Sequence, residues 1–585
     1  MARIERGLSR RGFLASAAQG GRAPNVVIVL ADDQGYGDLS CHGNPAQRTP
    51  HLDAMHRESI RFEDFHAAPM CTPTRGQLLT GRDAFANGAS SVSSGRAMFH
   101  RDLPTLPGIF ARAGYRTAIF GKWHCGDMAP YRPQDRGFQK ALWHPGYGLL
   151  AVSSRWNNDY FDPYLLDGEK WRRYEGYCTD VLFAEAMRWM QERGRAREPF
   201  LAYLPMVAPH APLFAPERYR EPYRNLPPRL KSFFAMIANL DENFGRLEAF
   251  LKRAGLRENT IVIFATDNGS ASGTQFFNSG MKGRKRELYD GGHRVPCFLR
   301  WPAGGLRPPG AITDLTQFQD LLPTLAGLCG VRLPGGMKLD GVSLEPSLRG
   351  RAQPDLASRM AVVQYSQPDG SPPAKGDAAV LWNRWRLVRG EELYDIGADP
   401  GQARDLAKAR PEILGRLRDH YAKWWDGVKE HVENLPPLYV GGAGAATELH
   451  SSDWIGPATD EQMEIREGVN QNGPWNLFVE RAGRYRIALR RWPRDTGAPI
   501  TAGLPAIQYR DGAITGWNPG GKALPIASAA IAVSGLEPSV PVRPGDQQAV
   551  IDVALRRGPA RLRSSFRDAD GRELCGAYFA SVEEA

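Results

Sequence analysis

The sequence predicts an α/β fold, in which an α/β/α sandwich around a large, mostly parallel sheet is followed by a small C-terminal β-sandwich-like domain. Short continuous apolar runs, typical of strands buried on both faces, recur along the first part of the chain. Amphipathic helical segments lie between these runs. Toward the C-terminus the runs give way to alternating apolar and polar residues, the pattern of antiparallel strands with one exposed face.

Four apolar runs are the predicted parallel strands, at residues 26–30, 117–120, 200–204 and 261–264. Each is followed within a few residues by polar side chains able to do chemistry, in order Asp32 and Asp33, then Lys122 and His124, then His210, and finally Asp267 and Asn268. Ligands of open α/β sheets bind beyond the carboxyl ends of the strands. The four polar groups are therefore expected in one pocket.

The predicted helices between these strands occupy residues 106–113, 179–193 and 230–254, where apolar residues recur at three- and four-residue spacing. Another helical stretch, residues 411–425, ends the larger unit before Pro436 and Pro437 break the pattern. We therefore expect an N-terminal segment at 1–23, a catalytic domain at 24–436 and a β-rich domain at 437–585. A chain of 585 residues is too long for one compact core, which agrees with this division.

The segment at 1–23 contains Ser9-Arg10-Arg11-Gly12-Phe13-Leu14, a twin-arginine export pattern. The apolar stretch that should follow stops within a few residues, at Gln19-Gly20-Gly21-Arg22. Two interpretations stay open, a degenerate export signal and a basic arm without a targeting role. Localisation is exported or periplasmic in the first case and cytoplasmic in the second.

Composition excludes several classes of protein. The chain is 42% hydrophobic and 24% charged, and no apolar run approaches the roughly 20 residues that span a bilayer. Its formal charge of +10 is spread along the chain, unlike the basic patches of nucleic-acid-binding proteins, and an anionic substrate explains it as well. Seven cysteines without a Cys-x-x-Cys pair indicate neither a zinc cluster nor a disulfide framework.

The densest motif is Cys71-Thr72-Pro73-Thr74-Arg75-Gly76-Gln77-Leu78-Leu79-Thr80-Gly81-Arg82. Thr72 suits a helix N-cap, Pro73 the first helical position and Gly81 the helix end, so Cys71 is expected just before a helix N-terminus. Free backbone N–H groups and the helix dipole favour an anion there, and Arg75 adds a positive charge one turn later. A cysteine in such a place, taken alone, is more often an inert core residue.

This segment resembles the signature of the type I sulfatases, the arylsulfatase-like, formylglycine-dependent branch of the alkaline phosphatase superfamily. That signature is Cys-x-Pro-x-Arg followed by Leu-Thr-Gly-Arg, and Thr74 stands where the family more often has Ser or Ala. The resemblance implies that a formylglycine-generating enzyme oxidises Cys71 to Cα-formylglycine. A hydrated aldehyde offers one hydroxyl to attack sulfur and another whose deprotonation expels sulfate, whereas a serine would remain a stable sulfate ester.

The predicted metal ligands are Asp32, Asp33, Asp267 and Asn268, an oxygen set suited to a hard cation. Ca²⁺ fits best and Mg²⁺ also fits. Either pair alone would more often be loop residues. Together they are similar to the family's metal-binding elements, which implies that Cys71, as formylglycine, completes the ligand set.

Three further elements resemble the family's catalytic motifs, namely Gly121-Lys122-Trp123-His124, Pro209-His210-Ala211-Pro212, and the segment from Gly283 to Pro296. The resemblance implies that Lys122, His210 and Lys285 bind sulfate, that His124 serves as a base in sulfate release, and that Lys285 protonates the leaving oxygen. With Arg75, these side chains would surround an anionic transition state. Asp290 replaces the family's commoner Glu.

The predicted function is hydrolysis of sulfate monoesters, of a small molecule or a carbohydrate. One alternative is a phosphonate monoester or phosphodiester hydrolase of the same superfamily. Another is a catalytically silent glycan-binding protein, suggested by Trp454, Trp475 and Trp492 in the C-terminal unit, although tryptophans are more often core residues. No motif identifies the sulfate ester itself, because specificity would lie in loops.

Overall fold

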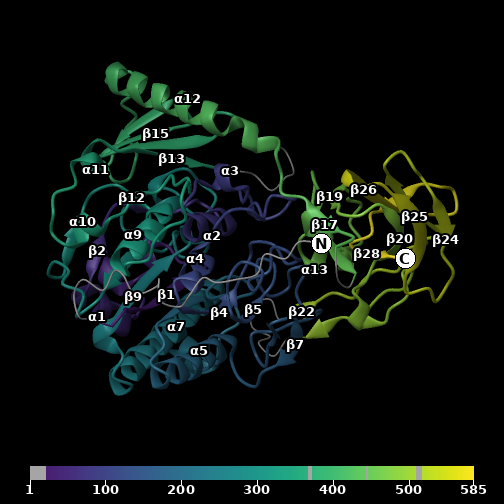
Figure 1. The fold of residues 1–585 in the computed structure, drawn as a ribbon, viewed down its shortest axis with the longest axis horizontal. Coiled ribbons are helices and arrows are strands. Elements are labelled where there is room, and N and C mark those ends of the chain that lie inside the picture. The colour runs from purple at the N-terminus through teal and green to yellow at the C-terminus, as the bar shows by residue number, and fades with distance from the viewer. Residues whose placement is uncertain (1–21, 366–371, 443–445, 509–516) are drawn as a thin grey trace, which may run out of the picture.

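The computed structural model describes residues 22–365, 372–442, 446–508 and 517–585 (Figure 1). The twin-arginine pattern at residues 9–14 lies outside these ranges. The larger part of the chain is built on a ten-stranded sheet with the strand order β11-β2-β10-β9-β1-β8-β4-β5-β6-β7.

The middle of this sheet consists of parallel strands. Its members are β9 (Thr260–Thr266), β1 (Asn25–Ala31), β8 (Phe200–Pro205), β4 (Arg116–Lys122) and β5 (Lys140–His144). Each is paired in parallel with its neighbour, and every residue of β9, β1 and β8 is buried. The four predicted strands are confirmed, and their carboxyl ends lie at one edge of the sheet.

Antiparallel strands occur toward both edges of the sheet, so it is mixed and only mostly parallel. On one side lies β10, which runs antiparallel to both β9 and β2, and on the other side lie β6 and β7. The bounds of these outer strands are β2 (Ile60–Phe62), β6 (Tyr164–Asp167), β7 (Lys170–Arg173), β10 (Cys297–Arg300) and β11 (Gly310–Ile312).

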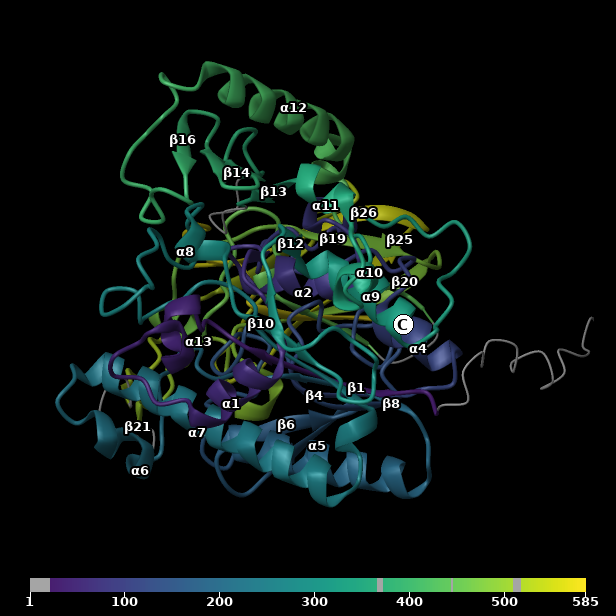
Figure 2. The same cartoon turned by 90° about the vertical axis from the view of Figure 1, so that its left-hand side faces the viewer.

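Helices cover both faces of the sheet, as the α/β/α prediction requires (Figure 2). Val27 and Val29 of β1 pack in the same hydrophobic cluster as α5 (Cys178–Arg195) and α7 (Pro228–Arg253). Val26 and Ile28 point to the other face, toward α4 (Leu106–Arg112) and α9 (Leu321–Leu328). The three predicted helices of this part are confirmed, with ends within two residues of the predicted positions.

A separate four-stranded antiparallel sheet was not predicted from the sequence. It consists of β13 (Met360–Gln364), β14 (Ala378–Trp382), β15 (Trp385–Val388) and β16 (Glu392–Asp395). Along it lies α12 (Pro411–Glu433), eight residues longer than the predicted helix. Figure 1 shows this sheet and α12 together at one end of the larger part of the molecule.

Buried charges join this small sheet to the main domain. Arg386 of β15 is 1% exposed, and its guanidinium donates to Asp64 Oδ1 at 2.6 Å and to Asp290 Oδ1 at 2.9 Å. The Asp64 carboxylate also bonds His66 Nε2, at 2.8 Å. Burial by itself raises the pKa of Asp64, but Arg386, His66 and Arg294 together outweigh burial and hold that pKa below its usual range.

Replacing Arg386 with alanine is expected to lower the free energy of unfolding by about 3–5 kcal/mol, because two buried carboxylates lose their partner. Thermal unfolding monitored by circular dichroism measures this loss. The matched control is Arg389→Ala, which removes an exposed guanidinium 3.2 Å from Asp377 and is expected to cost about 0–1 kcal/mol. Equal destabilisation by the two substitutions would contradict a structural role for the buried ion pairs.

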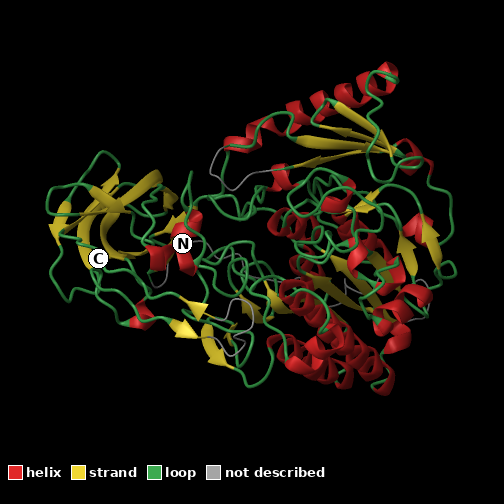
Figure 3. Cartoon of the chain, turned by 180° about the vertical axis from the view of Figure 1, so that it is seen from behind, coloured by secondary structure: helices red, strands yellow, loops and turns green. Residues whose placement is uncertain are grey.

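The C-terminal residues form two packed sheets, seen in Figure 3 as strands away from the helix-rich part. One has the order β17-β19-β26-β23-β24, with β27 beside β26, and the other the order β18-β28-β20-β25. Their bounds are β17 (Leu438–Val440), β18 (Thr447–His450), β19 (Trp475–Val479), β20 (Gly483–Arg490), β23 (Ser528–Val533), β24 (Ser539–Pro541), β25 (Ala549–Leu555), β26 (Gly558–Arg567), β27 (Glu573–Cys575) and β28 (Phe579–Glu584).

Side chains of both sheets share one hydrophobic cluster, as in a β-sandwich. The predicted β-sandwich-like domain is confirmed, and its strands pair antiparallel except that β17 runs parallel to β19. Trp454, Trp475 and Trp492 are all buried in this cluster, which confirms their interpretation as core residues. The domain boundary at residue 436 stays a prediction.

Within the described ranges, the structure contains no helix that is both long enough and apolar enough to cross a membrane.

Candidate functional site

The carboxyl ends of the parallel strands bring together the polar residues that were predicted to share a pocket. Asp32 and Asp33 directly follow β1, and Lys122 is the last residue of β4. His210 follows β8, and Asp267 and Asn268 follow β9. All of these side chains are buried except that of His210, which is partly exposed.

Gly121 allows β4 and β8 to approach closely at this edge. Its φ is +137°, and a Cβ at this position would lie 1.9 Å from the carbonyl oxygen of Pro205. No side chain fits there, so glycine is required beside Lys122.

Cys71 is the first residue of α2 (Cys71–Thr80) and is buried. The predicted N-cap at Thr72 is wrong, because the extended residue before the helix is Met70 and Pro73 lies in the first turn. Proline is tolerated there because first-turn N–H groups have no intrahelical acceptor. Thr72 instead donates its hydroxyl to the carbonyl of His124 at 2.9 Å. Gly81 ends the helix in the left-handed conformation, as predicted.

The thiol of Cys71 lies between an acidic and a basic side chain. Its Sγ is 3.4 Å from Asp32 Oδ1 and 3.6 Å from Lys285 Nζ. Burial, with a contribution from Asp32, raises the pKa of this thiol to about 12. An unmodified Cys71 would therefore stay protonated near neutral pH, which makes the thiol itself a poor nucleophile.

Arg75 holds the ends of two strands together. Its Nη2 and Nε donate to Asp267 Oδ2 at 2.7 and 3.1 Å, and its Nη1 donates to the carbonyl of Lys122 at 2.9 Å. The side chain is fully buried, and Nη2 also lies 3.6 Å from Asp32 Oδ2. Arg75 therefore fixes the carboxylates of the site in position and compensates their charge.

Two lysines pair with the two adjacent aspartates. Lys122 Nζ is 2.5 Å from Asp32 Oδ2, and Lys285 Nζ is 2.5 Å from Asp33 Oδ1. Burial alone raises the pKa of Asp33, but the surrounding positive charges, chiefly that of Lys285, hold it below the usual range. Burial likewise lowers the pKa of Lys285, but the neighbouring acidic groups, chiefly Asp33, together more than reverse this effect. Both partners are thus ionised at neutral pH.

The two histidines of the site are neutral at pH 7, and each holds its proton on the ring nitrogen that bonds a backbone carbonyl. His124 Nε2 lies 3.1 Å from the carbonyl of Val92 and so carries the proton. Its Nδ1 is buried and finds no hydrogen-bond partner in the described part of the chain. Burial, with the charge of Lys122, lowers the pKa of His124 well below its ordinary value. The geometry makes Nδ1 a proton acceptor.

His210 presents the opposite nitrogen. Its Nδ1 bonds the carbonyl of Ala211 at 2.7 Å, which leaves Nε2 as the acceptor, 3.7 Å from Asp33 Oδ2. Burial lowers the pKa of His210 to about 3. The ring of Tyr147 lies 5.4 Å from that of His210, between centroids, and adds an aromatic wall to this side of the site.

The residues of the site fit a bound divalent cation. One potential ligand atom each from Asp32, Asp33, Cys71 and His210 lie within 4.8 Å of one another. The remaining predicted ligands are adjacent, because Asp33 N–H donates to Asp267 Oδ1 at 3.2 Å and Asn268 Nδ2 to Asp33 Oδ1 at 3.0 Å.

The amide oxygen of Asn268 supports this fit. It is buried and unpaired within the described ranges, so it is an acceptor without a donor. The pKa of Asp267 is raised to about 6 by burial and by the neighbouring charge of Asp32. A cation among these oxygens would satisfy the orphan acceptor and relieve the repulsion between the carboxylates.

A cavity of about 390 Å³ opens beside this group and is lined by Asp33, His210 and Lys285. Arg229, Arg284 and Arg286 also line it. A larger cavity of about 790 Å³ lies elsewhere, between residues such as Arg101, Tyr439 and Glu480. The smaller cavity is the candidate substrate site, because it alone of these two contains Asp33, His210 and Lys285.

Sequence reasoning found the residues at the strand ends but missed Arg229, Arg286 and Tyr147 around them. Arg229 belongs to the first turn of α7, and the other two lie in loops. No local pattern marks these side chains, because their position follows from how distant loops pack against the strand ends.

Comparison with known proteins identifies the family to which this sequence is similar. Residues 24–331 match the sequence profile of the Sulfatase family. Arylsulfatase A of Homo sapiens is 31% identical over 483 residues, which span 75% of this chain and 88% of the relative. N-acetylgalactosamine-6-sulfatase of Mus musculus is 29% identical over 366 residues, 58% of this chain and 69% of that protein.

Solved structures show the same similarity. The crystal structure of Ps i-CgsB in complex with k-i-k-neocarrahexaose superposes with a TM-score of 0.62 at 25% identity, covering 69% of this chain and 93% of that one. The phosphonate monoester hydrolase of Agrobacterium radiobacter shares the fold alone, with a TM-score of 0.50 at 20% identity, over 70% of this chain and 96% of that chain.

Proposed function

Since this chain belongs to the sulfatase family, we propose that its nucleophile is a formylglycine made from Cys71 and that it acts together with a bound calcium ion. The chain is a sulfate ester hydrolase. A formylglycine-generating enzyme is the maturation partner that this proposal requires. The observation that carries it is the place of Cys71 Sγ, at the start of α2 between Asp32 Oδ1 and Lys285 Nζ.

A hydrated aldehyde at position 71 would be a better nucleophile than the thiol of Cys71. The thiol is buried with a raised pKa, whereas a hydrated aldehyde supplies one hydroxyl as nucleophile and a second whose deprotonation releases sulfate. Asp32 Oδ1 is placed to accept a proton from the hydroxyl at this position.

The protein's own side chains then have separate roles. Lys285 Nζ, 3.6 Å from Sγ, is placed to protonate the leaving oxygen of the ester. His124 offers its Nδ1, which has no hydrogen-bond partner among the described residues, as the base for sulfate release. Lys122 and His210 bind the oxygens of the sulfuryl group, and Arg75 holds Asp32 and Asp267 in place.

Calcium is proposed because the donors are mostly carboxylate and amide oxygens. Asp32, Asp33, Asp267 and Asn268 would hold it, together with the oxygen of formylglycine at position 71. When bound, such an ion polarises a sulfate oxygen and lowers the pKa of the hydrate. Mg²⁺ suits the same donors but demands a stricter octahedral arrangement.

The charges of the site support an anionic substrate. Three carboxylates, Asp32, Asp33 and Asp267, are balanced by Arg75, Lys122 and Lys285. A dication would therefore leave two positive charges, which match a sulfate monoester anion and one deprotonated hydroxyl of the nucleophile.

We propose a carbohydrate sulfate ester as substrate. Two relatives named above are a sulfatase of N-acetylgalactosamine and a protein crystallised with a neocarrahexaose, and another similar structure contains D-glucosamine-2-N, 6-O-disulfate. The candidate cavity agrees with a polar, anionic ligand, because Arg229, Arg284 and Arg286 line it.

Turnover of matched aryl sulfate and aryl phosphonate esters tests the reaction. The sulfate is expected to have a kcat/KM roughly ten- to a hundredfold higher, since a phosphonate replaces one of three acceptor oxygens with carbon and leaves a buried donor unpaired. Faster phosphonate cleavage would overturn the sulfatase assignment. Sulfated mono- and oligosaccharides in the same assay test the substrate class, and turnover of the aryl ester alone would contradict it.

A further inference from the structure

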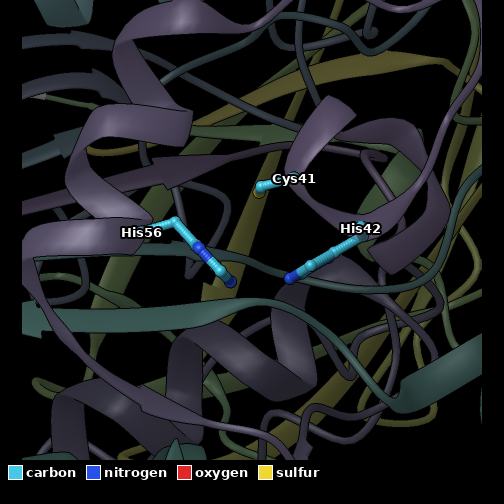
Figure 4. A group of neighbouring side chains, drawn as sticks. All are labelled: Cys41, His42 and His56. Atoms are coloured by element: carbon cyan, nitrogen blue, oxygen red, sulfur yellow. The ribbon is translucent and has the colours of Figure 1, made fainter. Parts of the chain in front are cut away.

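A second group of potential metal ligands lies outside the active site. Cys41, His42 and His56 each offer one ligand atom, and these atoms all lie within 4.8 Å of one another (Figure 4). Cys41 and His42 belong to the 3-10 turn η3 (Ser40–His42), and His56 belongs to α1 (Pro50–Glu58). All three side chains are half-buried. The proposed catalytic residues are not part of this group.

Asp53 of α1 holds the turn η3 in position. Its Oδ1 accepts the backbone N–H of Cys41 at 3.0 Å, and its Oδ2 accepts the hydroxyl of Ser40 at 2.8 Å. Thr49, just before α1, bonds the same carboxylate and the backbone N–H of Ser40. The backbone that carries two of the three ligands is thus fixed to the helix that carries the third.

A hydrogen bond fixes the ring of His42. Metal-binding histidines usually donate their other ring N–H to a carbonyl or carboxylate in this way. Its Nδ1 donates to the carbonyl of Tyr36 at 2.8 Å, so the proton resides on Nδ1 and the lone pair on Nε2. The ring stacks on Tyr36, with centroids 3.7 Å apart and planes 10° apart. Burial lowers the pKa of His42 to about 4, which keeps Nε2 unprotonated at pH 7.

Aromatic contacts also fix His56. Its ring centroid lies 5.2 Å from that of Phe298 and 5.7 Å from that of His42, in edge-to-face arrangements. In Figure 4 the nitrogen-bearing edges of the two imidazoles turn toward each other, with the Cys41 side chain beside them. Burial also lowers the pKa of His56.

Charges of both signs surround the group, because Asp53 lies beside Cys41 while Arg294 acts on His42 and Arg61 on His56. The thiol of Cys41 lies beside the Asp53 carboxylate, and burial together with that charge keeps its pKa above the usual range. Without a cation, a thiolate here would be unfavourable. With one, the thiolate and the Asp53 carboxylate supply two negative charges and the neutral imidazoles supply two nitrogen donors.

We propose that Cys41 Sγ, His42 Nε2 and an imidazole nitrogen of His56 bind a Zn²⁺ ion, with water as the fourth ligand. One sulfur and two nitrogen donors suit a borderline-soft transition ion in tetrahedral geometry and not a hard cation such as Ca²⁺. The absence of a Cys-x-x-Cys pair argued against zinc at the level of sequence. The structure supplies the ligands differently, because α1 folds back over the turn that precedes it.

The ion would brace a loop next to the active site. The carbonyl of His42 accepts the hydroxyl of Ser279 at 3.0 Å, and His42 stacks on Tyr36, three residues after Asp33. The ion would therefore rigidify the contact between η3 and the loop that contains Ser279.

Cobalt spectroscopy on the full chain tests the site. The protein is prepared as Cys71→Ala, so that the active site offers no thiol, saturated with Ca²⁺ and titrated with Co²⁺. The expected result is tetrahedral cobalt absorption and a thiolate-to-cobalt charge-transfer band, both complete at one equivalent and both lost on adding Zn²⁺. Without a charge-transfer band at one equivalent in protein of unchanged far-ultraviolet circular dichroism, the proposal is wrong.

Further variants in the same background assign the band to its ligands. Cys41→Ser is expected to abolish the charge-transfer band, and His56→Ala to weaken Zn²⁺ binding at least about tenfold. The matched control, Cys329→Ser, removes another half-buried thiol and should leave both unchanged. A band that survives Cys41→Ser would overturn the proposal. If Cys41→Ser does not fold, His56→Ala decides the question, because unchanged Zn²⁺ affinity in that variant also contradicts the site.

Discussion

Replacing Cys71 with serine is expected to lower the steady-state kcat for aryl sulfate hydrolysis by about 10⁴-fold or more. Serine keeps a hydroxyl at the start of α2, beside Asp32 and Lys285, so it can still attack sulfur. It lacks the second hydroxyl needed to expel sulfate. The variant should therefore release at most one equivalent of phenol per chain and then stall.

A single-turnover assay with quenched time points measures this release, and mass spectrometry locates the sulfate on the serine introduced at position 71. The control is Cys329→Ser, a cysteine outside the site, which should retain the parent rate. Multiple turnover by the Cys71→Ser variant within about tenfold of the parent rate would show that the nucleophile is elsewhere.

Removal of the metal is the second large expected effect. Dialysis against a chelator should lower kcat/KM by about 10³-fold, because a Lewis acid at this site contributes several kcal/mol to stabilising the transition state. Restoration by Ca²⁺ and not by Zn²⁺ would assign the loss to the oxygen ligands of the active site. The same result would show that the lost activity does not come from removing an ion bound by Cys41, His42 and His56.

The Asp33→Asn substitution is expected to lower activity in the same way as removal of the metal. The substitution removes a carboxylate ligand and leaves Lys285 without its partner, so metal affinity and kcat/KM should both fall by about 10²-fold or more. Asp377→Asn, a change at a partly exposed aspartate just before β14, is the control and should leave both unchanged. Full activity in chelator-treated protein that retains no metal would contradict a metal-dependent mechanism.

Much of the catalytic architecture could be predicted because its signals are local. A strand such as β1 is buried on both faces and therefore appears as an uninterrupted apolar run. The carboxyl ends of parallel strands share one edge, so Asp32, Lys122 and Asp267 could be placed together without a structure. The start of α2 was misplaced by two residues, because Pro73 suits a helical first position and is equally tolerated within the first turn.

Other features depend on contacts between distant parts of the chain. The small sheet of β13–β16 meets the main domain through Arg386 and Asp64, which lie 322 residues apart. The group of Cys41, His42 and His56 forms where the turn η3 packs against the helix α1. The hydrophobic pattern of the sequence does not reveal this contact. Arg229 of α7 and Arg286 of a later loop line the same candidate substrate cavity, although they are far apart in the sequence.

The mass of the peptide that contains residue 71, from protein coexpressed with a formylglycine-generating enzyme active on other sulfatases, tests the central claim most directly. We expect the mass of an aldehyde in place of the thiol, a product that reacts with hydrazides, and sulfatase activity in proportion to the converted fraction. An unmodified Cys71 in protein that hydrolyses sulfate esters at full rate would contradict the account.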